Sequence, residues 1–416
     1  MKWFICTVLL WVTVAAVSAQ QKTDAWLEHL LRTQASPLLQ QVLDEPDTFR
    51  YQLIYTQINR DENNRPHFKN YYLHLDKNLY FNPASTVKLP VALCALEKLH
   101  ELQVPGLDRN TAMLTDSSYS AQAKWYTDSL SANGLPSIAQ YIKEIFLISD
   151  NDAYNRLYEF VGQQTLNEKL WQKGYTNSRI TRRFMPMTEE ENRHTNAIRF
   201  VQDGESVYQQ APAYNTKPFD FSRQYLVGKA YLDRHDSLIN RPMDFTTHNV
   251  LPLQDLQQLL QSVLFPQSVP AKKRFSLTVD DYALLYRYMS ELPFESRYPH
   301  YDTATYFESY TKFFMFKADK RPIPTYIRIF NKPGWSYGFL TDAAYIVDFK
   351  NNIEFMISAS IYTNSDAVLN DDKYEYETIG YPFFKETGNI IYQYELKRPR
   401  KYVPDLSTFR INYRDK

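Results

Sequence analysis

The first third of the chain changes from helical spacing of its hydrophobic positions to alternation, and then to a continuous apolar stretch. Apolar side chains recur every three or four positions between residues 24 and 42, which predicts an amphipathic helix. Residues 51–58 and 67–75 alternate like two strands, joined by a polar turn at 61–66. Asn82-Pro83 then interrupts the chain, and the apolar stretch after it predicts a long helix to about residue 102.

The later patterns predict helices first and strands afterwards. A helix is expected over 137–147 and another after residue 152, so the corner between them falls near residue 150. Strands are expected at 325–330, 340–349 and 353–362, and a helix from about 374 to 385 that extends towards 397. Strands from both chain ends therefore predict one antiparallel sheet with an all-helical domain inserted between them, an α/β (α+β sandwich) fold.

The first residues have the pattern of a secretory signal peptide. Lys2 precedes an apolar run over 3–16, and Val17-Ser18-Ala19 offers small residues for cleavage after about Ala19. We therefore expect a secreted or periplasmic protein with no membrane span after cleavage, although an uncleaved N-terminal anchor is the alternative. Cleavage would leave Cys94 as the only cysteine, within an apolar string, which predicts core packing and excludes an internal disulfide.

Charge and composition argue against nucleic acid and a charged membrane surface as partners. The 47 basic and 47 acidic residues balance to a formal net charge of zero, so there is no basic field for nucleic acid. The eight histidines are scattered without a ligand-type pair, which argues against a metal site, and no cofactor is expected. Oligomeric state stays open at this level.

Three short strings carry most of the chemical information. They are Ser85-Thr86-Val87-Lys88, Ser149-Asp150-Asn151 and Lys332-Pro333-Gly334. Their patterns are S-x-x-K, S-D-N, and K-P-G where K-T-G or K-S-G is usual. Each is common alone, but together and in this order they resemble the active-site set of class A β-lactamases and penicillin-binding serine enzymes.

The spacing within S-x-x-K has a physical meaning of its own. A serine is a weak nucleophile until a base takes its proton, and a lysine three positions later on a helix lies on the same face. That lysine acts as a base only when neutral, and burial with a second cation nearby lowers its pKa. Lys332 is the candidate second cation for Lys88. Ser85 at a helix start also offers its own N–H to a developing oxyanion.

The resemblance implies a β-lactamase/transpeptidase-like fold over about residues 24–395 and a catalytic set within it. Ser85 would be the nucleophile and Lys88 its base or proton relay. Ser149 would pass a proton to the leaving nitrogen, and Lys332 would supply positive charge near Ser149 and the substrate carboxylate. The implied activity is that of a serine hydrolase that forms an acyl-enzyme with a small-molecule substrate, a β-lactam or a related amide or ester such as a cell-wall-type peptide.

The resemblance also implies a substrate-binding set. Asn151 would hold the amide side chain of the substrate, and the N–H of Trp335, next to Gly334, would complete the oxyanion hole with that of Ser85. Pro333 stands where the family has a hydroxyl that helps to bind the substrate carboxylate. Ser336 is then a replacement partner, unless the loss means that ordinary penicillin binding is absent.

A second departure concerns deacylation. In class A β-lactamases a glutamate before a proline activates the deacylating water, whereas Met185 precedes Pro186 here, in the string 182–186. A thioether accepts no proton, so this mechanism is not inherited directly. Glu189, Glu190 and Glu191 lie just downstream as substitutes, although a solvated acidic loop or helix start explains them more simply.

The expected organisation follows from these assignments. Residues 1–19 are the signal peptide, 20–398 the hydrolase domain and 399–416 a C-terminal tail. The α/β part covers about 20–84 and 320–398, and the helical part about 85–319 with an insert near 196–245 that is either a lid over the cleft or a surface loop. Alternatives are a penicillin-binding D,D-peptidase-like enzyme and a sensor or binding protein that captures its ligand without turnover.

Overall fold

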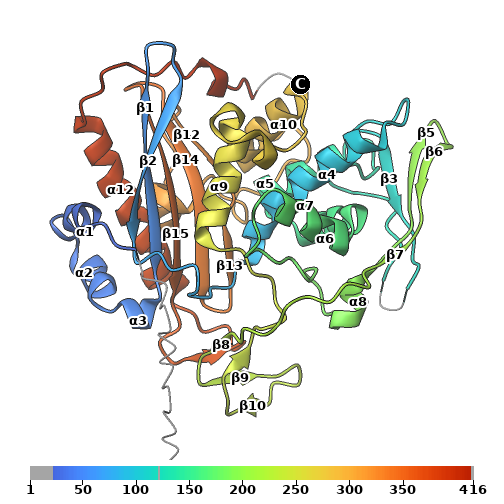
Figure 1. Ribbon diagram of the computed structural model, residues 1–416, viewed down its shortest axis with the longest axis horizontal. Helices are drawn as coiled ribbons and strands as arrows, with labels where there is room; N and C mark the ends of the chain where they lie inside the picture. Colours follow the sequence, from blue (N-terminus) through green and yellow to red (C-terminus); the bar gives the residue numbers. More distant parts are fainter. Residues whose placement is uncertain (1–21, 120–121, 414–416) are drawn as a thin grey trace, which may run out of the picture.

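A six-stranded antiparallel sheet forms the centre of the computed structural model, which describes residues 22–119 and 122–413 (Figure 1). The strand order is β12-β14-β15-β1-β2, with β13 paired to β14. The strands are β1 Gln52–Arg60, β2 Pro66–Leu73, β12 Ile327–Asn331, β13 Gly334–Ser336, β14 Phe339–Asp348 and β15 Ile353–Tyr362. The predicted mixed α/β fold, with a sheet from both chain ends, is confirmed. The predicted signal peptide lies outside the described residues.

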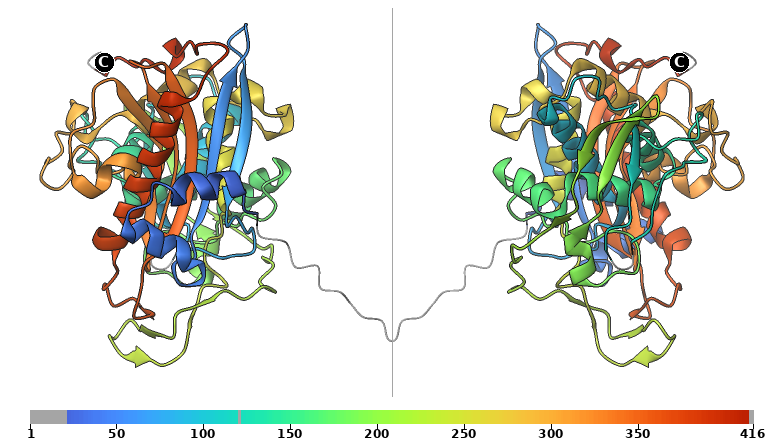
Figure 2. Two further views of the ribbon diagram at one scale, coloured as in Figure 1. Left: turned by 90° about the vertical axis from the view of Figure 1, so that its left-hand side faces the viewer. Right: turned by 90° about the vertical axis from the view of Figure 1, so that its right-hand side faces the viewer.

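Helices cover both faces of the sheet, so its two central strands are buried on both sides (Figure 2). Every position of β14 and β15 is buried. Neighbouring residues of one strand point to opposite faces, so Tyr345 packs in the cluster on the side of the helical part and Ile346 in the cluster on the other side. In the left view of Figure 2, the N-terminal helices and α12 (Tyr381–Lys397) cover this second face.

The N-terminal helical prediction is corrected in one respect. Residues 24–42, expected as one helix, form α1 (Ala25–Arg32) and part of α2 (Pro37–Asp44), and α3 (Pro46–Phe49) follows. Pro37 cannot donate the backbone hydrogen bond that a continuous helix needs, and Ser36 before it is extended with ψ 166°. The Ser36 hydroxyl instead caps the new helix by accepting from the Leu39 N–H.

The helical part surrounds a central buried helix. Residues Ala84–Val87 form a 3₁₀ turn that continues into α4 (Lys88–Leu102), whose residues from Lys88 to Glu97 are all buried. Cys94 is one of them, as the apolar string predicted. The other helices are α5 Ile138–Leu147, α6 Asn151–Val161, α7 Gln163–Gln172, α8 Glu189–Arg193, α9 Leu253–Leu264, α10 Val279–Ser290 and α11 Phe313–Phe316. A π turn, Tyr376–Gly380, leads into α12.

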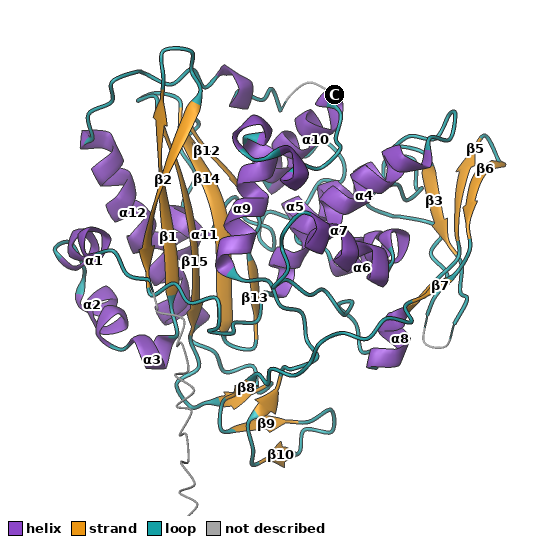
Figure 3. Ribbon diagram, in the orientation of Figure 1, coloured by secondary structure: helices purple, strands orange, loops and turns teal. Residues whose placement is uncertain are grey.

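The part expected to be all-helical also contains short strands, seen in orange away from the central sheet in Figure 3. They form the sheets β3-β5-β6, β4-β7, β8-β11 and β10-β9-β16. Their bounds are β3 Ala112–Thr115, β4 His194–Thr195, β5 Ile198–Gln202, β6 Glu205–Gln210, β7 Ala213–Tyr214, β8 Leu226–Val227, β9 Ala230–Leu232, β10 Leu238–Ile239, β11 Met243–Asp244 and β16 Val368–Leu369. Most of them fall in the segment 196–245, and strands this short are too brief to show an alternating pattern.

The last described residues pack on the molecule. Leu406, Phe409 and Tyr413 are buried, and the Phe409 ring meets that of Tyr345 on β14 edge to face at 4.8 Å. The segment predicted as a tail therefore completes the core on the helical side of the sheet. No helix among the described residues is long and apolar enough to cross a membrane.

Candidate active site

A cavity of about 700 Å³ lies between the sheet and the helical part, and the three sequence strings meet there. Its lining includes five residues of the predicted set, namely Ser85, Ser149, Asn151, Trp335 and Ser336. Lys88 and Lys332 lie outside the lining itself, but both ammonium groups donate hydrogen bonds to the hydroxyl of Ser149, which lines the cavity. The fold thus gathers one segment from the start of α4, one from the α5–α6 corner and one from β13.

Ser85 is presented on a strained turn. Ala84 before it has φ 43°, in the left-handed region that a residue with a Cβ rarely adopts. The turn is held by the Ala84 N–H, which donates to Asn82 Oδ1 at 2.9 Å, and by the Thr86 hydroxyl, which donates to the Pro83 carbonyl. Among the residues that the structure describes, none forms a hydrogen bond with the Ser85 hydroxyl, so it is free to meet a substrate.

Gly334 brings β13 against the start of the serine helix. A Cβ at this position would lie 2.6 Å from the Ser85 nitrogen and 2.8 Å from the Pro83 oxygen. Only glycine permits this approach. The next residue, Trp335, pairs with Leu340 of β14 and is thereby fixed beside the Ser85 backbone. This close contact brings β13 and the serine turn together beside the cavity that Ser85 and Trp335 both line.

The S-D-N string forms the corner before α6. Ser149 has φ 60°, and the Asp150 carboxylate accepts from the Ala153 N–H, so that α6 begins at Asn151. The Lys88 ammonium donates to the Ser149 carbonyl and to Asn151 Oδ1 at 2.8 Å. Lys88 also lies 3.3 Å from the Ser149 hydroxyl, and the Lys332 ammonium donates to the same hydroxyl at 2.8 Å. One hydroxyl therefore connects the two lysines.

Burial makes both lysines weaker acceptors of a proton. Burial lowers the pKa of Lys88 to about 7. Burial, with repulsion by Lys88, lowers the pKa of Lys332 well below its ordinary value. Because the two ammonium groups share one desolvated place, a charge on Lys88 disfavours a charge on Lys332.

A second buried cluster lies behind Lys332 and was not predicted. Asn331 donates to both oxygens of Asp342, at 3.0 and 2.9 Å, and accepts from the Lys312 ammonium at 2.8 Å. Burial raises the pKa of Asp342 to about 7 and lowers that of Lys312 to about 7. Asp342 is the acid that attracts Lys332, and nothing in the sequence marks it, because it lies within an apolar strand.

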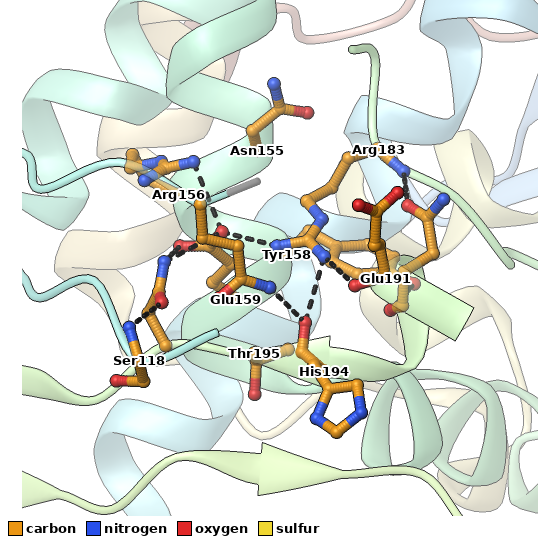
Figure 4. A network of polar contacts seen from close by, with 12 residues as sticks. Ser118, Asn155, Arg156, Tyr158, Glu159, Arg183, Glu191, His194 and Thr195 are labelled. Atoms are coloured by element: carbon orange, nitrogen blue, oxygen red, sulfur yellow. Dashed lines mark hydrogen bonds and ion pairs between the residues drawn. The ribbon is translucent and has the colours of Figure 1, made fainter. Parts of the chain in front are cut away.

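The loop 182–186 closes the helical side of the cavity and is anchored by a buried ion pair (Figure 4). The guanidinium of Arg183 and the carboxylate of Glu159 are both fully buried, and Arg156 lies 3.2 Å from the same carboxylate. The Phe184 N–H donates to Asn155 Oδ1 at 2.8 Å, and the Phe184 ring faces the Lys88 ammonium at 5.2 Å. An aromatic face thus covers the Lys88 ammonium.

No glutamate takes the place that Met185 leaves. Met185 lines the cavity, and within residues 22–119 and 122–413 no aspartate or glutamate does so. The three glutamates considered as substitutes belong to α8, outside the described lining. Glu191 caps that helix with Thr188, and Glu190 lies 3.3 Å from the His194 ring. Their simpler interpretation, as the start of an exposed helix, fits this placement.

Sequence reasoning missed the arginine side of the cavity. Arg182, Arg234, His248 and Asn249 all line it, and Arg234 comes from the turn between β9 and β10. Asn249 Oδ1 accepts from the N–H groups of Thr181 and Arg182, which fixes the start of the loop. The only sequence signal was the length of the segment before Lys332. Of the described residues, no group of three or more histidines, cysteines or acids is arranged to hold a metal ion.

The architecture and the meeting of these three strings define the class of β-lactamase-like proteins. A model of the Beta-lactamase enzyme family matches residues 16–223, and the chain belongs to this family. Among solved structures, PBP-A is similar, with 14% identity over 91% of this chain and 98% of its own and a TM-score of 0.49. Two β-lactamases are also similar. That of Streptosporangium roseum has 14% identity over 89% and 98% of the two chains (TM-score 0.47). That of Sphaerobacter thermophilus has 11% identity over 87% and 98% (TM-score 0.47). A search of curated proteins finds no match.

Proposed function

We propose that this chain is an exported serine hydrolase of the class A β-lactamase type. Ser85 would be acylated by a β-lactam or a related amide or ester, and water would then release the product. The observation that carries the proposal is the hydroxyl of Ser149, which is shared by two buried lysines in the cavity that Ser85 lines. This arrangement supplies a nucleophile, a base and a proton relay within one desolvated place.

Acylation begins when neutral Lys88 takes the proton of the Ser85 hydroxyl as the oxygen attacks the substrate carbonyl carbon. A pKa of about 7 gives Lys88 a substantial neutral fraction at neutral pH. The N–H groups of Ser85 and Trp335 stabilise the resulting oxyanion. When the tetrahedral intermediate collapses, the C–N bond breaks and Ser149 passes a proton to the leaving nitrogen.

A substrate carboxylate would decide which lysine carries the proton. An anion beside Lys332 favours the charged form of that lysine. Repulsion then keeps Lys88 neutral, as its role as a base demands. Pro333 lacks the hydroxyl that would bind the substrate carboxylate, and the hydroxyl of Ser336, which lines the cavity, is proposed to bind it instead. Binding of an anionic substrate would in this way activate the enzyme.

Asn151 is proposed to hold the amide side chain of the substrate. Its Oδ1 accepts from Lys88 at 2.8 Å. Within the described chain no hydrogen bond involves its amide NH₂ group, although the residue lines the cavity. A carbonyl of the substrate can therefore accept from that group.

A second function is favoured by the absence of a carboxylate from the described lining of the cavity. With Met185 in place of the glutamate, water has no strong base beside it, and deacylation is expected to be slow. A long-lived acyl-enzyme would fit a penicillin-binding D,D-peptidase-like enzyme, or a binding protein that captures its ligand.

The intact mass of the mature protein during incubation with a reporter penicillin tests these proposals, with Ser85→Ala as the control. We expect a penicilloyl adduct on the wild type and none on the variant. Rapid loss of the adduct supports a working β-lactamase, and a persistent adduct supports the penicillin-binding alternative. No adduct at all would refute β-lactam recognition. The mass of the protein recovered after export would test cleavage after about Ala19.

A further inference from the structure

The helical wall of the cavity presents two arginines that the proposed chemistry does not use. Arg182 lines the cavity from the loop after α7, and Arg234 lines it from the β9–β10 turn. Neither guanidinium forms an ion pair with any described residue. Arg182 donates to the ring nitrogen of His248, and Arg234 to that of His235. The neighbouring Asp233 carboxylate attracts Arg234 but does not form an ion pair with it.

Arg182 is held in place for binding. Its N–H donates to Asn249 Oδ1 at 3.0 Å, and its carbonyl accepts from the Tyr154 hydroxyl at 2.9 Å. Burial, with the nearby charge of Arg182, lowers the pKa of His248 to about 3, so His248 is a neutral acceptor that orients the guanidinium without neutralising it. A fixed guanidinium loses little entropy when it binds an anion.

Arg234 is exposed, but the hairpin that carries it is fixed to the rest of the molecule. Strand β9 pairs in parallel with β16, and Asn370 Nδ2 donates to the Leu232 carbonyl at 3.0 Å. A Cβ on Gly228 would lie 2.6 Å from the Ala367 carbonyl oxygen, so glycine is required for this contact. Figure 1 shows β8, β9 and β10 below β13, which carries Trp335 and Ser336. The segment expected as a lid or a surface loop therefore contributes directly to the cavity.

Among the described residues, the charged side chains that line the cavity are all basic. Lys88 and Lys332 lie at its base, Arg182 and Arg234 at its wall, and no acid lines it in the described part of the chain. Asp233, next to Arg234, accepts from the N–H groups of His235 and Ser237 at 2.8 and 3.0 Å and closes its own turn. A cleft lined by one sign of charge concentrates ligands of the opposite sign.

We propose that the cavity selects acyl substrates carrying a second anionic group, a carboxylate on the acyl side, which Arg182 and Arg234 bind. The inference rests on the proposed function, in which the first carboxylate lies near Lys332 on the leaving-group side. Asn151, which would hold the acyl side chain, begins α6, and the loop of Arg182 packs on the same helix through Phe184 and Asn155. The acyl substituent is thus directed to the arginine wall, where a planar guanidinium suits a carboxylate.

A matched pair of penicillins tests the inference. Benzylpenicillin and carbenicillin differ by one carboxylate on the acyl side chain. We expect the second-order rate constant of acylation, followed by intact mass, to be about tenfold higher with carbenicillin, the value of one charge-assisted hydrogen bond. Arg182→Gln and Arg234→Gln should each reduce this ratio severalfold, and Arg234→Glu should reverse it. Arg241→Gln, in the same insert but outside the described lining, should keep the wild-type ratio.

The two proposals fail in different ways. If neither penicillin acylates the wild type, the proposed function is refuted, but calorimetric binding of the same two compounds to Ser85→Ala still tests the arginine wall. Tighter binding of carbenicillin that is lost in Ser85→Ala/Arg234→Gln supports the inference. Equal rates for the two penicillins in the wild type, or a preference that survives both arginine substitutions, would overturn it. The preference should also fall as salt is added, since exposed charges are screened.

Discussion

Gly334→Ala tests whether the contact between β13 and the serine turn creates the site. The new Cβ would lie 2.6 Å from the Ser85 nitrogen and 2.9 Å from that of Thr86. Both are backbone atoms, so no side chain can rotate away. Ordinary contact begins at 3.4 Å, and β13 must therefore retreat by roughly 0.8 Å.

That displacement is large on the scale of catalysis. A shift of about 1 Å at reacting groups costs on the order of 100-fold in rate, and loss of one oxyanion donor costs about 100- to 1,000-fold. We therefore expect acylation by a reporter penicillin to fall at least about 100-fold in Gly334→Ala. The protein should remain folded, because the retreat involves the three-residue strand β13, which lies outside the main strand order and pairs with β14.

The assay measures the rate constant of acylation by intact-mass spectrometry of samples quenched at successive times. Circular dichroism confirms that each variant is folded. Gly388→Ala on α12 is the control. Its Cβ would meet Met315 Cγ at 2.9 Å, away from the cavity, so it should lower the melting temperature and leave acylation as it is. If Gly334→Ala acylates within threefold of the wild type, the close approach of β13 is not what forms the oxyanion hole.

Three further outcomes are expected. Acylation should rise roughly tenfold per pH unit from pH 5 and level off above about 7, because burial lowers the pKa of Lys88 to about 7 and only its neutral form accepts a proton; a flat profile from pH 5 to 9 would exclude Lys88 as the base. Met185→Glu should shorten the lifetime of the acyl-enzyme at least about tenfold, whereas the uncharged Met185→Gln should not; equal lifetimes in time-resolved mass spectra would mean that a carboxylate at 185 does not reach the water. Glu159→Gln should lower the free energy of unfolding in urea by about 3–5 kcal/mol, since it leaves the buried Arg183 without its counter-charge; a loss below about 1 kcal/mol would show that this ion pair does not anchor the loop.

The sequence predicted those parts of the site that depend on local spacing. Ser85 and Lys88 face one way because a helix places residues three apart on one side, and the S-D-N corner falls where two helical patterns meet. The strands were found within a few residues, since β14 and β15 are long and mostly apolar. The positions of these elements did not require knowledge of the packing.

What stayed out of reach depends on long-range contacts. From the sequence, Asp342 is only one polar residue within a mostly apolar strand. Its cluster with Asn331 and Lys312 forms through the fold and cannot be predicted from local spacing. Arg234 lies in the turn between the short strands β9 and β10. The position of this hairpin is set by the pairing of β9 with β16, which is distant in sequence. Pro37 is a sequence signal for the break between α1 and α2. The helical spacing of apolar residues continues on both sides of it, and this spacing favoured a single helix.

The pairing of β1 with β15 has a consequence for the order in which the molecule acquires its activity. Gln52 pairs with Ser360, and the Ser149 hydroxyl receives its bond from Lys332. A chain emerging from the ribosome contains Ser85 early, but its hairpin β1–β2 then lacks the neighbour β15 that continues the sheet. Folding that waits for such distant partners is slow, since loop closure precedes the stabilising contacts. The cavity around Ser85 would therefore be complete only after nearly the whole chain has been released.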